Sequence, residues 1–341
     1  MPIFNVLSQP FRSLHLPSPG SFKGQTVIIT GANTGLGLAT AQHTLNLGAT
    51  KVILGVRTIS KGEEAKAKIL AETTNPNASI KVWQVDLNSF ASVKAFAARA
   101  AKLEKLDTAI MNAGLATGKW KLSPEGWETH LQVNVLSTVL LSLLLLPTLV
   151  RTGKSSSPGA GKLRPHLTIV GSDVHADASL PERKEPNVLA AMNDEARWEV
   201  SNRANPAERY AASKLLGMYG AFEVAKCVPM IGDEPAVVVD VVAPGFCKSE
   251  LLSREQAPWM LVAVQSLTGR TVAEGAKTVV DAASRGVDAH GKYLDHQKFA
   301  KLGPLIASEE GQQTQVKVWR EIFEVLKKST PEISSIVAGN V

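Results

Sequence analysis

The sequence predicts a single α/β domain whose core is a doubly wound parallel sheet of about seven strands. Short apolar runs alternate along the chain with segments whose apolar residues recur at helical spacing. In addition, a glycine-rich stretch joins the first apolar run to the first helical segment. Alternating strands and helices build parallel sheets that are covered by helices on both faces, with right-handed crossovers.

The predicted strands are short apolar runs without a helical period. They are expected at 26–30, 51–56, 80–85, 108–111, 167–170, 237–242 and 292–294. The predicted helices lie between most of these strands and repeat their apolar residues at helical spacing. They are expected at 38–47, 61–73, 90–103, 135–150 and 211–227. Ligands of such a sheet bind beyond the carboxyl ends of its strands, so the functional residues are expected there.

One domain is predicted for residues 24–330. Residues 1–23 contain four prolines, which break any long helix, and are expected to form an irregular extension. Residues 331–341 are expected to form a C-terminal tail. The segments that depart from regular alternation are an exposed loop, a long insertion and a region that can cover a pocket as a substrate lid. The loop is expected at 154–164, the insertion at 173–209 and the lid within 246–315.

The composition fits an ordinary globular protein. Of 341 residues, 44% are hydrophobic, which is enough for a sizeable core. The net charge of +6 comes from scattered residues, and the sequence lacks a dense basic run with interleaved aromatics, so no nucleic-acid partner is expected. Cys227 and Cys247 lack metal-ligand or redox spacing. They are expected to be buried thiols in a reducing compartment, although spacing alone leaves a bond between them open.

A cytoplasmic location is expected. The N-terminus lacks the basic start, apolar run and cleavage site of a secretory signal. The apolar stretch 135–150 is the only membrane candidate, and it contains Pro147 and falls short of the roughly 20 residues that cross a bilayer. A helix packed on the sheet explains it better, so no stable membrane insertion is expected.

The glycine-rich turn after the first strand is a candidate phosphate site. Its backbone N–H groups and the positive end of the following helix suit a pyrophosphate, and its glycines let the backbone approach the ligand closely. The candidate contacts are Gly31, Asn33, Thr34, Gly35, Leu36 and Gly37. A tight turn without a ligand can use the same residues, but the strand before it and the helix after it favour a dinucleotide.

Tyr210 and Lys214 are the candidate acid–base pair. Their spacing of four places both on one face of a helix, where the cation is expected to lower the pKa of the phenol from about 10. A tyrosine tuned in this way can exchange a proton near neutral pH. A surface Tyr/Lys pair is the alternative. Ser172 at a strand end can bind a substrate oxygen or cap a turn, and Asn134 before an apolar helix can be a simple cap.

Together these residues resemble the short-chain dehydrogenase/reductase family, over roughly residues 24–300. The glycine turn resembles the family's cofactor motif, and Asn134, Ser172, Tyr210 and Lys214 match its catalytic tetrad in order. The remaining matches are the adenine-contacting pair, the motif after the fourth strand and the segment after the sixth. They are Asp86 and Leu87, then Asn112, Ala113 and Gly114, then Pro244, Gly245 and Ser249. The resemblance implies a Rossmann-type fold.

Within the family the chain is most similar to the retinol-dehydrogenase-like branch, on Pro244 to Leu251 and on Val56-Arg57. It is also similar to fungal members of secondary metabolism, on Ser172 to His175 and 187–191. It departs from the family at Met111, where a second asparagine is common. The separation of 38 between Ser172 and Tyr210 is also far longer than usual, so the substrate side does not transfer by analogy.

The resemblance implies a mechanism. Tyr210 protonates a carbonyl oxygen while hydride moves from the nicotinamide to the carbonyl carbon. Lys214 binds the nicotinamide ribose and lowers the tyrosine pKa, Ser172 holds the substrate oxygen, and Asn134 anchors a water that links Lys214 to solvent. The protein supplies orientation and protons, and the cofactor does the redox chemistry. A non-redox enzyme or a cofactor-sensing protein on the same fold is the alternative.

NADP(H) is the expected cofactor. NAD sites usually carry a carboxylate near the end of the second strand, about 20 residues beyond the glycines. Here no Asp or Glu lies between Thr50 and Gly62, and Arg57 stands 20 residues after Gly37. A guanidinium can form charge-assisted bonds to a 2′-phosphate. The alternative is that Arg57 merely ends a strand in solvent.

The expected substrate is a bulky, mostly apolar ketone or secondary alcohol. The region where the family builds its lid is rich in apolar residues, which bind apolar ligands by area. These residues are Phe246, Leu251, Leu252, Trp259, Met260, Leu261 and Val262. Simple packing on the sheet is the alternative. A monomer is expected because the insertion 173–209 can fold over the tyrosine helix, but 135–150 can also form a dimer interface.

Overall fold

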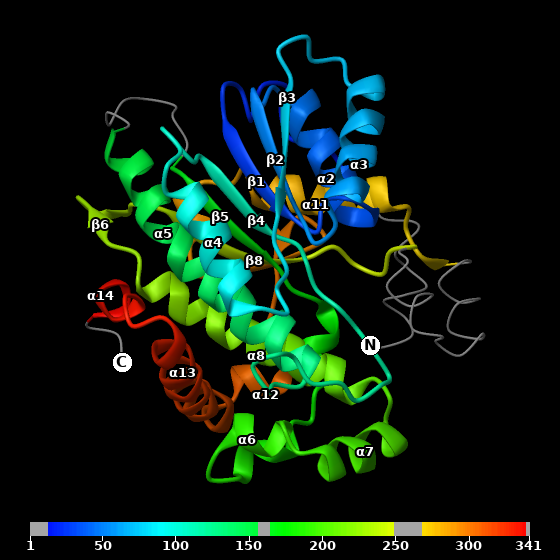
Figure 1. The fold of residues 1–341 in the computed structure, drawn as a ribbon, viewed down its shortest axis with the longest axis vertical. Coiled ribbons are helices and arrows are strands. Elements are labelled where there is room, and N and C mark those ends of the chain that lie inside the picture. The colour runs from blue at the N-terminus through cyan, green and yellow to red at the C-terminus, as the bar shows by residue number, and fades with distance from the viewer. Residues whose placement is uncertain (1–12, 156–163, 249–267, 339–341) are drawn as a thin grey trace.

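The structure, a computed structural model, describes residues 13–155, 164–248 and 268–338 (Figure 1). Its centre is an eight-stranded sheet in the order β10-β9-β8-β5-β4-β1-β2-β3. The strands are β1 Thr26–Thr30, β2 Lys51–Val56, β3 Ser79–Gln84, β4 Thr108–Met111, β5 His166–Val170, β8 Val238–Ala243, β9 Tyr293–Asp295 and β10 Lys298–Phe299. All neighbours pair in parallel except β9 and β10. The doubly wound fold class is confirmed.

All seven predicted strands are present, with ends shifted by at most one residue. β10 was not predicted. It is two residues long and follows a turn at His296 and Gln297, both with positive φ, so it pairs back onto β9 as an antiparallel edge. A strand this short has no periodicity to detect.

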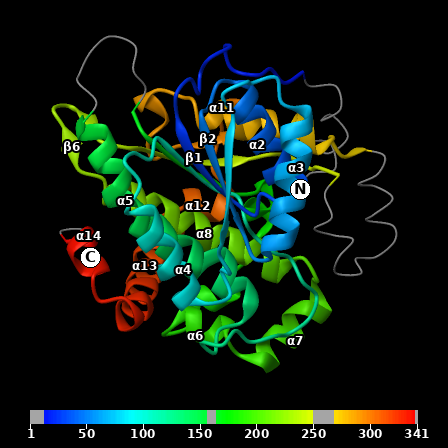
Figure 2. The ribbon, with the colours of Figure 1, turned by 45° about the horizontal axis from the view of Figure 1, so that its top comes forward.

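Helices cover both faces of the sheet (Figure 2). On one face lie α2 Gly35–Asn46, α3 Ile59–Glu72 and α11 Val272–Ala282. Their buried residues form a cluster with β1 and β2 that includes Leu45, Ile69 and Val279. On the other face lie α4 Phe90–Ala100, α5 Thr138–Ser155 and α8 Glu208–Lys226. They share a second, larger apolar cluster. These crossovers bring the carboxyl ends of the parallel strands together at one edge.

The long apolar helix is part of the core. The predicted helix 135–150 corresponds to α5 and to a π-helical turn, η2 Leu131–Ser137, that precedes it without a break. The combined segment Leu131–Ser155 is long and apolar enough to cross a membrane by length and composition, but 83% of its most apolar stretch is buried inside the protein. Its apolar residues are therefore explained by packing, as expected from the sequence.

The insertion 173–209 forms a small helical layer below the sheet (Figure 1). Its elements are η3 Asp173–Asp177, η4 Pro181–Lys184, α6 Val188–Met192 and α7 Glu195–Ala204. It is fixed to the start of α8 by buried charges. Glu208 accepts hydrogen bonds from the backbone N–H groups of Ser179 and Leu180, and Arg209 pairs with Glu182 at 3.1 Å.

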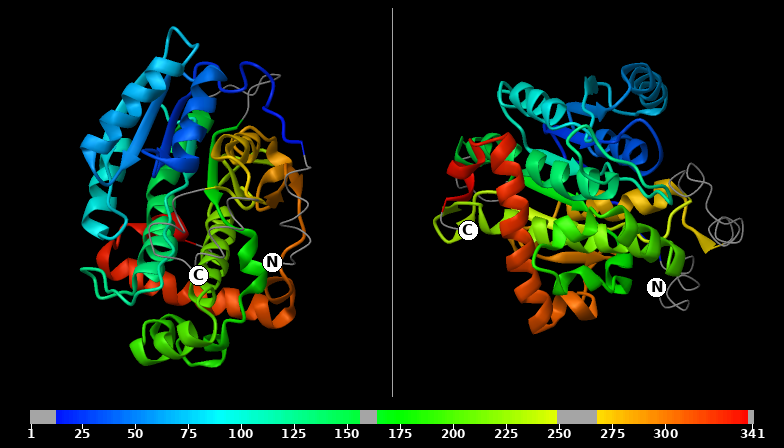
Figure 3. Two further views of the ribbon diagram at one scale, coloured as in Figure 1. Left: turned by 90° about the vertical axis from the view of Figure 1, so that its right-hand side faces the viewer. Right: turned by 60° about the horizontal axis from the view of Figure 1, so that its bottom comes forward.

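The outer faces of α5 and α8 are covered by the C-terminal helices (Figure 3). α13 Glu309–Ser329 packs on α8, and α14 Ile333–Val337 packs on α5 with Ile333 and Val337 fully buried. The remaining elements are short: β6 Met230–Ile231, β7 Glu234–Pro235, η5 Val287–Ala289 and α12 Pro304–Ala307. The cover of the α8 face thus comes from α13 as well as from the insertion.

Candidate functional site

The glycine turn lies between β1 and α2 and leaves little room for side chains. Gly31 and Gly35 have positive φ, and α2 begins inside the motif at Gly35 rather than at the predicted residue 38. A Cβ atom on Gly37 would lie 2.4 Å from the carbonyl oxygen of Gly31. Thr34, the N-cap residue of α2, makes no side-chain capping hydrogen bond. The first N–H groups of α2 therefore remain available to an anion.

The Asn112 to Gly114 motif after β4 is hydrogen-bonded to the residue at which the glycine turn begins. The side-chain amide of Asn112 donates to the carbonyl of Thr30 at 2.9 Å. The Thr30 hydroxyl accepts the backbone N–H groups of Asn112 and Ala113, each at 3.0 Å. Gly114 is exposed, and a Cβ there would lie 3.4 Å from Lys214 Nζ. The glycine turn and the candidate acid–base group are therefore adjacent.

The residues expected to meet the adenosine end follow β2 and β3. Arg57 is exposed directly after β2. Leu87 is buried, and Asp86 is half-buried with its carboxylate accepting the backbone N–H of Asn88 at 2.9 Å. Arg57 and the Asp86-Leu87 pair thus lie at the carboxyl ends of neighbouring parallel strands, on the glycine-turn side of the sheet.

Tyr210, Lys214 and Ser172 come together although the tyrosine lies 38 positions after the serine in the sequence. All three side chains are half-buried, and the Ser172 hydroxyl, which donates to the Asp173 carboxylate at 3.3 Å, lies close enough to the Tyr210 phenol to affect its pKa. Lys214 Nζ lies 5.8 Å from the centre of the tyrosine ring and donates to the carbonyl of Val170 at 3.1 Å. Ser172 also caps η3, which confirms the capping interpretation, and its binding of a substrate oxygen stays a prediction.

The expected effect of Lys214 on Tyr210 is wrong for this structure. Burial raises the pKa of the Tyr210 phenol well above its ordinary value, and the nearby Ser172 hydroxyl only partly opposes this. Burial also lowers the pKa of Lys214 to about 8. The ammonium donates to a backbone carbonyl rather than to the phenol oxygen, and the i,i+4 spacing could not show how far each group is withdrawn from water.

Asn134 is not a helix cap, because it lies inside the π-helical turn η2. Its side chain accepts the N–H of Leu115 at 2.9 Å and donates to the carbonyl of Leu115 at 2.8 Å. It also donates to the hydroxyl of Ser213, which in turn donates to the carbonyl of Tyr210. Ser213 was missed from the sequence. Its spacing of three from Tyr210 on a helix was the signal that it belonged to the same group.

A small cavity lies beside Lys214 and Asn134. Its volume open to the centre of a water molecule is about 10 Å³, close to the least that one water needs. The lining residues are Met111, Ala113, Asn134, Thr138, Ile169, Val170, Gly171, Lys214, Gly217 and Met218. The expected water between Asn134 and Lys214 therefore has a place in which to fit.

The segment after β8 is described only at its start. Gly245 has positive φ, and the following residues pair with Arg270, whose N–H donates to the carbonyl of Phe246 at 2.9 Å. Cys247 and Cys227 are both buried thiols. Most of the expected lid region 246–315 is described and forms α11, η5, β9, β10 and α12 instead of a lid. Ser249 and six of the apolar residues named for the lid lie outside the described residues, namely Leu251, Leu252, Trp259, Met260, Leu261 and Val262.

Comparison with known proteins gives relatives over the whole chain. The short chain dehydrogenase family model matches residues 25–157. The short chain dehydrogenase/reductase dmxR8 of Cryptosporiopsis sp. (strain 8999) is 36% identical over 97% of this chain and 98% of its own. The short chain dehydrogenase atnD of Emericella nidulans is 39% identical over 84% of this chain and 88% of its own. Both organisms are fungi, in line with the resemblance drawn from the sequence.

Solved structures share the fold. An uncharacterised protein from Mycobacterium paratuberculosis matches with a TM-score of 0.63 and 23% identity, over 92% of this chain and 96% of its own. The short-chain dehydrogenase of Sphingobium yanoikuyae in complex with NADPH matches with a TM-score of 0.54 and 18% identity, over 91% of this chain and 95% of its own. Given the identity of the curated relatives over nearly its full length, the chain belongs to the short-chain dehydrogenase/reductase family.

Proposed function

We propose that this family oxidoreductase uses NADP(H) to interconvert a bulky, mostly apolar ketone or aldehyde and the corresponding alcohol. The observation that carries the proposal is the meeting of Tyr210, Ser172 and Lys214 beside a glycine turn that has no room for side chains. Proton donors and a dinucleotide cradle at one edge of the sheet are what carbonyl reduction requires.

The turn fits a dinucleotide. The uncapped start of α2 offers N–H groups, and the glycines leave space that a Cβ at Gly37 would close. The residues proposed to hold the cofactor are those of the glycine turn, Arg57, the Asp86-Leu87 pair, the Asn112 to Gly114 motif, Tyr210, Lys214, the Pro244-Gly245 pair and Ser249. When bound, the cofactor supplies or accepts the hydride.

The remaining chemistry belongs to the chain. The Tyr210 phenol, whose ordinary pKa of about 10 keeps it protonated at neutral pH, donates its proton to the carbonyl oxygen. The Ser172 hydroxyl holds the same oxygen. Lys214 binds ribose hydroxyls, and a water held in the cavity beside Asn134 would pass protons toward Lys214. This arrangement suits reduction, and the reverse reaction uses the same groups with Tyr210 as the base.

The preference for NADP(H) rests on Arg57. Its side chain is exposed at the end of β2, and no carboxylate occurs between Thr50 and Gly62 to bind ribose hydroxyls instead. The dehydrogenase of similar fold from Sphingobium yanoikuyae binds NADPH, which agrees with this assignment.

The substrate class and the oligomeric state are further parts of the proposal. Apolar residues after β8 support a bulky apolar substrate, and the fungal relatives support a place in secondary metabolism. A monomer is supported by the packing of α13 on α8 and of α14 on α5. Light scattering at micromolar concentration tests the oligomeric state, and a stable dimer would contradict the proposed monomer.

Turnover of a ketone panel tests the function. NADPH oxidation is followed with 1-tetralone, 2-decalone and a steroid ketone, and with pyruvate, dihydroxyacetone and a ketose as small polar comparators. Faster turnover of the apolar ketones is expected. A preference for the small polar carbonyls would refute the substrate class. Tight NADPH binding without turnover of any carbonyl would favour the non-redox or cofactor-sensing alternative.

A further inference from the structure

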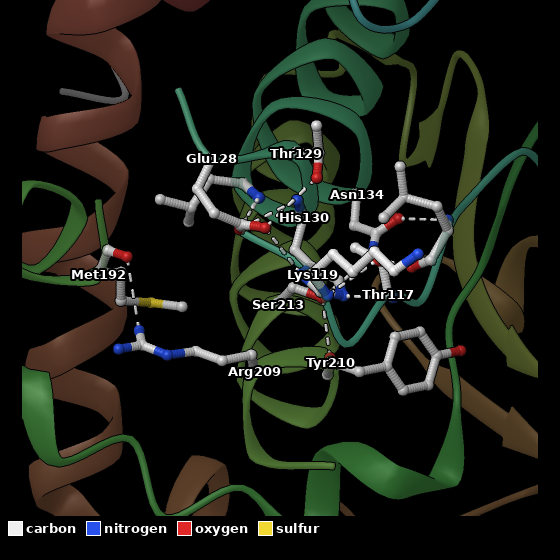
Figure 4. A network of polar contacts seen from close by, with 12 residues as sticks. Thr117, Lys119, Glu128, Thr129, His130, Asn134, Met192, Arg209, Tyr210 and Ser213 are labelled. Carbon is white, nitrogen blue, oxygen red and sulfur yellow. Dashed lines mark hydrogen bonds and ion pairs between the residues drawn. The ribbon is translucent and has the colours of Figure 1, made fainter. Parts of the chain in front are cut away.

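A buried, hydrogen-bonded glutamate–histidine pair lies shortly before Asn134 in the sequence (Figure 4). The Glu128 and His130 side chains are only 2% and 1% exposed, and His130 Nδ1 lies 2.9 Å from Glu128 Oε1. The other carboxylate oxygen accepts the backbone N–H groups of His130 and Leu131. Burial alone would raise the pKa of Glu128, but the hydrogen bonds from His130 and Leu131 outweigh it and hold the pKa below its ordinary value. Glu128 is therefore a carboxylate.

The far side of the His130 ring holds the chain that follows β4. His130 Nε2 lies 3.1 Å from the backbone nitrogen of Thr117. A backbone N–H can only donate, so Nε2 is the acceptor and Nδ1 carries the proton that is donated to Glu128. The carboxylate thus fixes the tautomer that the Thr117 N–H needs. Replacing either partner leaves a buried polar group without its hydrogen bond.

Two residues of one helical face hold this segment, residues 115–119, at alternate positions. Asn134 binds both backbone groups of Leu115, and His130 binds Thr117. The segment begins beside Gly114, next to Lys214 Nζ. The His130 ring also lies 6.5 Å from the ring of Tyr210, centre to centre. The Glu128–His130 pair therefore lies close to Tyr210, the candidate proton donor.

The insertion is tied to the same pair. The backbone N–H of Glu128 donates to the side chain of Asn193 at 2.6 Å, and the Asn193 amide donates to the carbonyl of Gly126 at 2.9 Å. At the far end of the segment, Trp120 meets Trp198 of α7 edge to face, with ring centres 6.0 Å apart. The segment 115–119 thus has a fixed place between the insertion and the tyrosine helix.

We propose that Glu128 and His130 are a positioning pair for the reaction. They hold the segment 115–119 beside Tyr210, so that this wall of the site orients the substrate carbonyl toward the phenol. Neither residue exchanges a proton with the substrate. The inference rests on the proposed function, because it concerns the geometry in which that carbonyl is reduced.

The test compares His130→Phe with His130→Gln in the full-length protein. The probe is 1-tetralone, or the panel ketone that the wild type turns over best. Phenylalanine removes both hydrogen bonds, and glutamine keeps an acceptor for the Thr117 N–H. Misplacing a reactant by about 1 Å can cost about 100-fold in rate, so His130→Phe is expected to lower kcat/KM at least about tenfold. His130→Gln is expected to recover most of that loss, and the Kd for NADPH should change little in either variant.

His166→Phe is the matched control. His166 is also a fully buried histidine bonded to a backbone carbonyl, but it begins β5 at the opposite end of the sheet from the site. It should lose stability without losing kcat/KM. Hydrogen exchange of the peptide covering 115–119 should accelerate in His130→Phe and stay unchanged in His166→Phe.

Two results would overturn the inference: wild-type kcat/KM in folded His130→Phe, or equal impairment of the Phe and Gln variants. If His130→Phe does not fold, Glu128→Gln takes its place, because the single carbonyl oxygen of an amide cannot accept both backbone N–H groups and also the Nδ1–H of His130. An unchanged kcat/KM and unchanged exchange in that variant would equally refute the pair. Failure of the wild type on every ketone refutes the proposed function instead, and the exchange measurement still tests the pair.

Discussion

Gly37→Ala gives the sharpest test of the glycine turn as a built cradle. The added Cβ would meet three fixed neighbours: the carbonyl oxygen of Gly31 at 2.4 Å, the side-chain nitrogen of Asn112 at 2.5 Å and the Cα of Ala32 at 3.0 Å. Ordinary contacts begin near 3.4 Å, so the neighbours must retreat by about 1 Å. That retreat breaks the Asn112 hydrogen bond to Thr30.

The expected loss follows from these contacts. Overpacking of this kind costs about 1–3 kcal/mol, and a lost hydrogen bond adds about 1 kcal/mol. The better helix propensity of alanine returns at most about 1 kcal/mol, because Gly37 is in the first turn of α2. We therefore expect the free energy of unfolding to fall by about 1–3 kcal/mol and the Kd for NADPH to rise at least about tenfold.

Urea denaturation and fluorescence titration with NADPH measure the two effects. Gly118→Ala is the control, because a Cβ there meets nothing within 4 Å and its φ is not in the left-handed region. It should change stability by no more than about 0.5 kcal/mol. If Gly37→Ala unfolds at the wild-type urea concentration and binds NADPH as tightly, the turn is not the close-fitting cradle described above.

Five further substitutions test the site and the core. Tyr210→Phe should lower kcat by about 100- to 10,000-fold with NADPH still bound, and Ser172→Ala by less; near-normal turnover would remove the tyrosine from the mechanism. Arg57→Ala should raise KM for NADPH but not for NADH, and an unchanged cofactor preference would contradict the NADP assignment. Gly217→Ala should place a Cβ 3.0 Å from the carbonyl oxygen of Asn134, inside the water cavity, and slow turnover with little change in ketone KM; unaltered kcat would exclude a proton path there. Burial raises the pKa of Asp240 well above its ordinary 3.8, so the folded protein loses stability as pH rises from about 3.8 through the folded-state pKa. Asp240→Asn should flatten that slope in urea denaturation at several pH values, and an unchanged slope would assign the pH dependence to another group.

Much of the sheet could be predicted because its strands are buried on both faces. Continuous apolar runs such as Val27–Ile29 and Val52–Leu54 are typical of strands that are buried on both faces of a parallel sheet. The ends of the predicted strands therefore agree with the structure to within one residue. Elements defined by distant contacts could not be read in this way. β10 exists because a turn at His296 and Gln297 folds it back onto β9.

The same distinction between local pattern and distant contacts applies to the residues of the candidate site. Residues at strand ends or on one helix face, such as Ser172, Tyr210 and Lys214, could be found because topology alone brings them together. Their electrostatics could not be predicted, since the tyrosine pKa depends on burial by neighbours far away in sequence. His130 gave no signal by itself, because a lone histidine beside an apolar run is most often a core residue. Only its two bonds, to Glu128 and to Thr117, give it a role.

The long separation of Ser172 from Tyr210 does not loosen the site, because each end of the insertion is anchored separately. At the start, His175 donates through Nδ1 to the carbonyl of Ser172 at 2.7 Å and accepts the N–H of Gly303 through Nε2 at 3.1 Å. At the end, Glu208 binds the backbone at Ser179. The helices between these anchors can therefore vary in length while the serine and tyrosine keep their places.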